Sequence, residues 1–180
     1  MLNNAQKDRL LWIARKTLAD YLAGGKEPEL KETDADLIQL CGAFVTLSTS
    51  GRLRGCIGYI QAVLPLYQTI SKMAIEAATG DPRFPEVTAK ELNNINIEIS
   101  VLTPLKLINN INEVEVGKHG LLIEKGFYFG LLLPQVAIEN KWDKYQFLDQ
   151  TCIKAGLDPG DWKEDAKIYI FSAQVFRENS

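Results

Sequence analysis

Residues 43–60 read AFVTLSTSGRLRGCIGYI, and this stretch decides how the rest of the chain is interpreted. Residues 43–47 are mostly apolar and predict a strand, the polar segment STSG predicts a turn, and residues 53–60 predict a returning strand. Two strands joined by so short a turn pair antiparallel, so the sequence predicts a β-hairpin. Gly55 and Gly58 lie inside the returning strand, and we expect them to interrupt it as a glycine-rich turn.

Helices are predicted on both sides of this hairpin. Leucine and alanine recur at helical spacing over residues 6–22, and a Gly-Gly pair follows as a stop signal. Pro65 is expected to open a second helix. Asp143 and Gly156 are the residues expected to cap the two ends of a third helix.

The remaining strands are short and closely spaced. Residues 96–102 alternate between apolar and polar side chains, as in a strand with one buried face. Residues 121–124 and 127–133 predict two more strands, and Ile168, Ile170 and Val175 predict a single last one. Because short turns join most neighbouring strands, the expected class is α+β, with mainly antiparallel sheets and helices.

Composition restricts the class of partner. The chain has 180 residues, 46% hydrophobic and 24% charged, which fits one ordinary domain or two tightly joined halves. The net charge is −3 and the pI is about 5.3, so there is no strong signal for binding nucleic acid. The longest uncharged run contains proline and glutamine, so no membrane association is expected.

The three cysteines, Cys41, Cys56 and Cys152, are odd in number and widely spaced, with no CxxC motif. This pattern predicts neither a disulfide framework nor a zinc cluster, and free thiols favour a cytoplasmic location. The GxxxxGK[ST], GxGxxG, GxSxG and HExxH motifs are absent. We therefore expect no metal site and identify no cofactor.

Cys56 is the first candidate for chemistry. Gly55 and Gly58 would let the backbone N–H groups point at an anion and lift the thiol out of the sheet. Arg54 adds positive charge nearby, which favours the thiolate, the nucleophilic form of cysteine. The alternative is that Cys56 is a small buried hydrophobic residue, which is a common environment for free cysteine.

Four further residues are candidates, each with a structural alternative. His119 is the only histidine and suits general acid–base work, or it is an ordinary loop residue. Arg83 lies between two prolines and would be presented to an anion, or it pairs with a neighbouring aspartate. Glu98 either faces a cleft or lies on a solvated strand face. Gln135 follows a proline that would fix its position.

The residues together resemble a known family, the AMME-syndrome candidate-region (AMMECR) family, whose prokaryotic members are called AmmeMemoRadiSam system protein A. The hallmark is Leu53-Arg54-Gly55-Cys56-Ile57-Gly58. Other segments follow in family order: residues 43–47, 81–85, 98–102, 117–120, 130–135, Trp142 and 154–157. The resemblance extends from about Arg9 to Phe176. One departure is Ala43, which stands where relatives often have cysteine.

The resemblance implies two unequal subdomains separated by a cleft. The larger would contain both termini, and the smaller would be inserted into it. Arg54, Cys56, Arg83, Glu98 and His119 would gather around the cleft. The family name also implies Memo-like and radical SAM partner proteins in a pathway that modifies a nucleic acid or a protein. Two functions follow: a Cys/His-dependent enzyme, or a non-catalytic module that binds a small anion or a partner.

Overall fold

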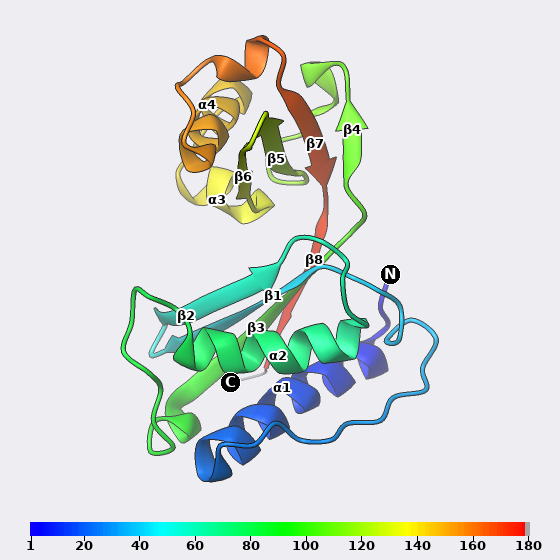
Figure 1. The fold of residues 1–180 in the computed structure, drawn as a ribbon, viewed down its shortest axis with the longest axis vertical. Coiled ribbons are helices and arrows are strands. Elements are labelled where there is room, and N and C mark those ends of the chain that lie inside the picture. The colour runs from blue at the N-terminus through cyan, green and yellow to red at the C-terminus, as the bar shows by residue number, and fades with distance from the viewer. Residues whose placement is uncertain (179–180) are drawn as a thin grey trace. The chain divides into compact units, whose positions relative to one another are not determined.

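A computed structural model describes residues 1–178, and the chain divides into two compact units (Figure 1). The first unit comprises Met1–Leu102 together with the C-terminal segment from Gln174. The second unit comprises Thr103–Ala173. No helix among the described residues combines the length and the apolar composition that crossing a bilayer requires.

The first unit is a four-stranded sheet with two helices on one face (Figure 1). The strand order is β2-β1-β3-β8, and β1 pairs antiparallel with both β2 and β3. Its elements are α1 (Asn4–Gly24), β1 (Ala43–Thr49), β2 (Arg52–Tyr59), α2 (Leu66–Thr79), the 3₁₀ turn η1 (Leu92–Asn94), β3 (Ile95–Leu102) and β8 (Ala173–Arg177).

Local sequence signals account for these two helices. Asn3 caps α1 in a capping box with Gln6, and Gly25 ends the helix in the left-handed conformation. Pro65 directly precedes α2, as predicted. Apolar side chains from α1, α2 and every second residue of β1 and β3 form one buried core. The helices therefore cover one face of the sheet and leave the other face without a helix from this unit.

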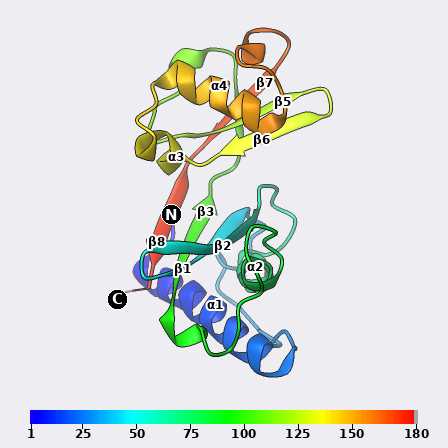
Figure 2. The ribbon, with the colours of Figure 1, turned by 90° about the vertical axis from the view of Figure 1, so that its left-hand side faces the viewer.

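The second unit is another antiparallel four-stranded sheet, with the order β4-β7-β5-β6. Helix α4 packs across β5 and β6 (Figure 2), and Asp143 and Gly156 cap it as predicted. Its elements are β4 (Lys106–Ile108), η2 (Ile111–Glu113), β5 (Gly120–Lys125), β6 (Tyr128–Leu132), α3 (Pro134–Glu139), α4 (Lys144–Ala155), η3 (Asp161–Lys163) and β7 (Lys167–Phe171).

The α+β class with antiparallel sheets is confirmed, but two strand predictions need correction. The single last strand expected around Ile168 and Val175 is two strands, because β7 belongs to the second sheet and β8 to the first. Strand β4 was not predicted, since its three residues are too few to show an alternating pattern.

Candidate functional site

The face of the first sheet opposite the two helices carries the candidate site, and we call it the helix-free face. Thr46 pairs with Cys56 on one side and with Glu98 on the other. Residues directly opposite each other in a sheet point to the same face, so the three side chains form one row across β2, β1 and β3. Their neighbours Val45 and Ile97 are buried against the helices, which places the row on the helix-free face.

Cys56 is held at three points. The Thr46 hydroxyl donates a hydrogen bond to the Cys56 sulfur, with Oγ1 and Sγ 3.2 Å apart. The Cys56 N–H donates to Oδ2 of Asp81 at 2.9 Å, and its carbonyl accepts from Nη2 of Arg83 at 3.4 Å. Because β2 is an outer strand, these side chains replace the missing neighbouring strand at Cys56.

The buried Asp81 carboxylate forms an ion pair with the exposed Arg83 side chain. The Asp81 carboxylate is 2% exposed and accepts from Nε and Nη2 of Arg83 at 2.9 and 2.7 Å. These hydrogen bonds hold the pKa of Asp81 well below its usual range, helped by the backbone N–H groups of Cys56 and Arg83. The Arg83 side chain is 55% exposed, and its Nη1 has no hydrogen-bond partner among residues 1–178.

The expected glycine-rich turn does not form. Gly55 and Gly58 lie within the continuous strand β2, and neither has a positive φ. Their role is close packing instead. A Cβ on Gly55 would lie 1.9 Å from the Ala77 carbonyl oxygen of α2, and a Cβ on Gly58 would lie 2.3 Å from the Phe44 ring. The helix and the aromatic ring approach the strand so closely that only glycine fits.

The Arg54 guanidinium makes hydrogen bonds within the protein and is not available to a ligand. Arg54 is the extra residue of a β-bulge, since Leu47 pairs with Gly55 and the next residue of β1 pairs with Leu53. Its guanidinium donates to the Glu91 carboxylate at 2.9 Å and to the carbonyl oxygens of residues 85 and 86. The bond from Arg54 to the Glu91 carboxylate, together with those from Thr88, lowers the pKa of Glu91 to about 2. Arg54 therefore ties the 81–91 loop to β2.

Two of the predicted site residues belong to the second unit. His119 lies just before β5, and its Nδ1 accepts a hydrogen bond from the Glu115 N–H at 3.2 Å. This contact assigns the neutral ring its proton on Nε2. Gln135 is half-buried in the first turn of α3. Cys56, Glu98, Arg54 and Arg83 all belong to the first unit.

The other two thiols differ from Cys56 in their surroundings. Cys152 is fully buried in the core of the second unit, and burial raises its pKa. Cys41 donates to the Leu102 carbonyl oxygen at 3.3 Å, and burial raises its pKa too. Cys56 is half-buried and has a hydroxyl donor on its sulfur. Within residues 1–178, no cluster of three His, Cys, Asp or Glu side chains is arranged to hold a metal ion.

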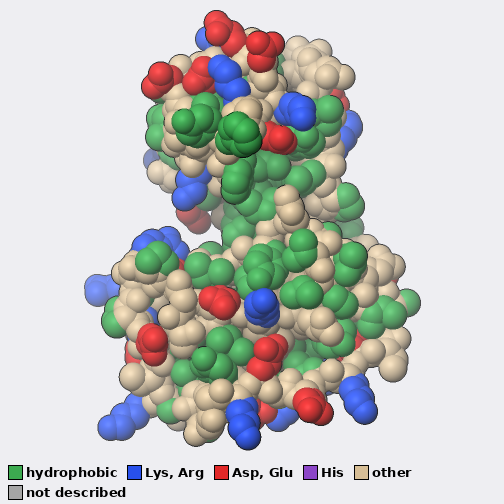
Figure 3. All heavy atoms as spheres, in the orientation of Figure 1, with side chains coloured by type: hydrophobic (Ala, Val, Ile, Leu, Met, Phe, Trp, Pro, Cys, Tyr) green, Lys and Arg blue, Asp and Glu red, His purple; other side chains and the backbone are tan. Residues whose placement is uncertain are grey.

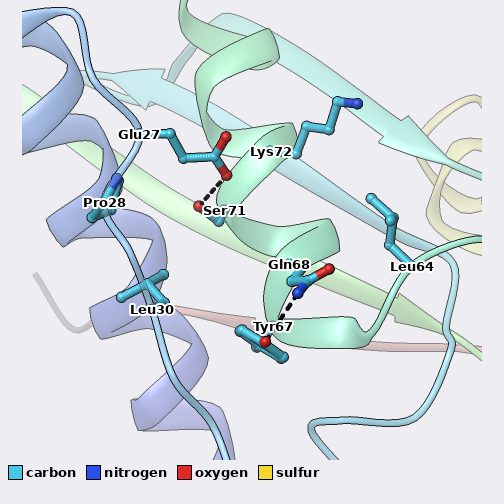
Figure 4. A pocket seen from close by; sticks show the side chains of 8 residues that line it. All are labelled: Glu27, Pro28, Leu30, Leu64, Tyr67, Gln68, Ser71 and Lys72. Carbon is cyan, nitrogen blue, oxygen red and sulfur yellow. Dashed lines mark hydrogen bonds between the residues drawn. The ribbon is translucent and has the colours of Figure 1, made fainter.

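Sequence reasoning missed Thr46 and the buried position of Asp81. The partnership of Thr46 with Cys56 depends on the hairpin register, which the predicted turn alone does not determine, because the β-bulge at Arg54 shifts the pairing by one residue. It also missed a polar pocket of about 270 Å³ between the loop after α1 and helix α2 (Figure 4). There Ser71, which also bonds to buried Thr17, donates to Glu27 at 3.0 Å, and this contact anchors the loop.

Fold and site together define a two-unit α+β protein with a thiol on the helix-free face of an antiparallel sheet. The chain belongs to the AMMECR1 family, which matches residues 11–176. Protein PF1979 of Pyrococcus furiosus is 46% identical over 94% of this chain and 86% of its own length. Protein MK0488 of Methanopyrus kandleri is 44% identical over 94% of this chain and 86% of its own length.

A solved structure has the same fold. It is the crystal structure of uncharacterized protein PH0010 from Pyrococcus horikoshii, which is 44% identical to this chain. The TM-score is 0.89, and the match covers 95% of this chain and 90% of that one. These matches assign the chain to a family of uncharacterised proteins and leave its chemistry to be inferred from the site.

Proposed function

We propose that the helix-free face of the first sheet is a thiol centre in which Cys56 acts as a nucleophile or as a transient covalent carrier. The observation that supports this most directly is the hydrogen bond from Thr46 to the Cys56 sulfur. A hydroxyl donor stabilises a thiolate more than a thiol, because the bond to a charged acceptor is the stronger one. The Arg83 guanidinium, anchored on buried Asp81, adds positive charge beside the same residue.

In this chemistry we propose His119 as the general base and Glu98 as an orienting carboxylate. Glu98 is the next side chain in the row beyond Thr46, and its Oε2 lies 4.0 Å from Nε of Arg177. A general base must take the thiol proton before Cys56 attacks an electrophile. The family resemblance groups His119 with Cys56, and because imidazole suits general acid–base work we propose His119 as that base.

The same resemblance supplies the proposed biological setting. We propose that the protein acts in the cytoplasm with a Memo-like protein and a radical SAM protein, in a pathway that modifies a nucleic acid or a protein. On the face of the first unit seen in Figure 3, acidic and basic side chains are intermingled. That distribution favours a specific partner over general attraction to nucleic acid.

Competitive alkylation of the native protein tests the thiol centre. At pH 7 we expect iodoacetamide to modify Cys56 before Cys41 and Cys152, as measured by peptide mass spectrometry. Denatured protein is the control, because unfolding exposes all three thiols equally. If native Cys56 reacts no faster than buried Cys152, the proposal is wrong. Reconstitution with both partner proteins then asks whether an adduct forms on Cys56 and is lost in Cys56→Ser.

A second candidate function is the binding of a small anion without bond formation. It is favoured by the exposed Arg83 side chain, whose Nη1 is free to donate, whereas Arg54 is fully engaged. In that case Cys56→Ser would keep phosphate binding measured by calorimetry, and Arg83→Met would lose it. A thiol centre predicts instead that Cys56→Ser abolishes adduct formation on the peptide that contains residue 56, whether or not the variant still binds phosphate.

A further inference from the structure

Each sheet has two outer strands, and three of these four edges are protected. At Cys56, the outer backbone groups of β2 are satisfied by Asp81 and Arg83. Beside β8 lies the N-terminal segment, where Gln174 exchanges two hydrogen bonds of 3.0 Å with the backbone of Leu2. Strand β4 has only three residues and begins with Lys106. Short length, charge and side-chain cover are the usual means of preventing edge-to-edge pairing.

Strand β6 has none of these protections within the described part of the chain. Its five residues, Tyr128–Leu132, include no charge and no proline. Phe129 is 65% exposed and Tyr128 is 56% exposed. An uncharged, aromatic outer strand of this kind is a template for pairing with another strand.

The hairpin loop shows which backbone groups of β6 point outward. Strands β5 and β6 are joined by two residues, of which Gly126 has a positive φ, as in the common two-residue hairpin loops. The residues that flank such a loop, Lys125 and Tyr128, form a hydrogen-bonded pair. Because hydrogen-bonded and non-hydrogen-bonded pairs alternate, the N–H and C=O groups of Phe129 and Leu131 point away from β5. No residue among 1–178 supplies partners for them.

We propose that β6 pairs antiparallel with β6 of a second copy of this chain, about a twofold axis at Gly130. In this register Phe129 lies opposite Leu131 of the second copy, so each such pair can exchange two backbone hydrogen bonds. The outward groups of one strand thus meet those of the other, as an interface with twofold symmetry requires. Two four-stranded sheets would join into one continuous sheet.

The side chains are complementary in the same register. Phe129 and Leu131 project from the face of the sheet opposite α4, since the intervening Gly130 packs against the backbone of Ala155 in that helix. Each Phe129 ring would therefore cover Leu131 of the second copy, and aromatic–aliphatic pairs across strands are favourable. With no charge on β6, nothing in the strand opposes pairing with itself.

Sedimentation equilibrium across a wide range of protein concentration tests this proposal. We expect a dimer that dissociates on dilution. Phe129→Lys should shift the protein to monomer, because two like-charged lysines would enter the paired edge. Leu131→Pro should do the same by removing an outward N–H, a change that an outer strand tolerates. Phe127→Lys is the matched control: this fully exposed residue lies in the loop, outside the paired register, and its variant should stay dimeric.

Circular dichroism would verify that each variant is folded, and Phe129→Lys alone decides the matter if Leu131→Pro fails to fold. A wild-type protein that is monomeric at every concentration would overturn the proposal. A dimer that survives Phe129→Lys, or one that is lost equally in Phe127→Lys, would overturn it as well.

Discussion

Asp81 is the residue that holds the backbone of Cys56 in position. Its buried carboxylate binds both the Cys56 N–H and the Arg83 guanidinium. Asp81→Asn removes the charge from these hydrogen bonds, and we expect it to lower the free energy of unfolding by about 2 kcal/mol at pH 7. Asp20→Asn, which breaks an exposed pair with Lys16, is the matched control and should change stability by less than about 0.5 kcal/mol. Urea denaturation measures both.

The same carboxylate makes stability depend on pH in the acid range. Hydrogen bonds from Arg83 depress the pKa of Asp81 in the folded protein, and Arg54 lowers that of Glu91 to about 2. The unfolded chain therefore binds more protons than the folded one below about pH 4.5, and stability rises with pH there. We expect the free energy of unfolding to be fully present above about pH 5 and to fall as the pH approaches 2. Asp81→Asn should flatten this slope, and an unchanged slope would remove Asp81 as its cause.

At the scale of elements, the close packing of β2 against α2 restricts which substitutions Gly55 tolerates. Its Cβ position lies 1.9 Å from a backbone oxygen of α2, so neither partner can yield by a side-chain rotation. We expect Gly55→Ala to destabilise the fold by about 3 kcal/mol or to prevent folding. Gly24→Ala, at the end of α1, meets no atom within 4 Å and should be neutral or stabilising. Thermal melts of the two variants make the comparison, and equal melting temperatures would contradict it.

Much of the element order could be predicted because local signals determine it. The sequence predicted the helix caps at Gly25, Asp143 and Gly156 and the alternation of β3, and the fold contains all of them. The division of β7 and β8 between two sheets could not be predicted, because no glycine or proline separates the two strands in the sequence. Which sheet a strand joins depends on contacts between segments far apart in sequence.

The sequence indicated candidate residues for the site but not the contacts they make. Cys56, Glu98 and Arg83 were identified as candidates, and the structure places all three in the first unit. Gly55 was assigned to a turn, because glycine permits unusual backbone torsions and also permits close packing. A single sequence does not distinguish these two uses, and here the second applies.

At the scale of the whole molecule, the proposed general base His119 belongs to the second unit. If His119 is the general base for Cys56, then His119→Gln should slow alkylation of Cys56 at pH 7 while leaving Cys41 unchanged. Glu115→Gln is a useful control, because its backbone N–H still bonds to His119 and only an exposed charge is lost. An unchanged rate in His119→Gln would limit the thiol centre to the first unit.

The central claim is that Thr46 and Cys56 form a thiol centre on the helix-free face, and the alkylation rate of Cys56 in two Thr46 variants tests it most directly. Thr46→Ser keeps the hydroxyl and should match the wild type. Thr46→Val keeps the shape and loses the donor, so the rate at pH 7 should fall about fivefold, the factor for one hydrogen bond of about 1 kcal/mol. Equal rates in the valine and serine variants would contradict the account.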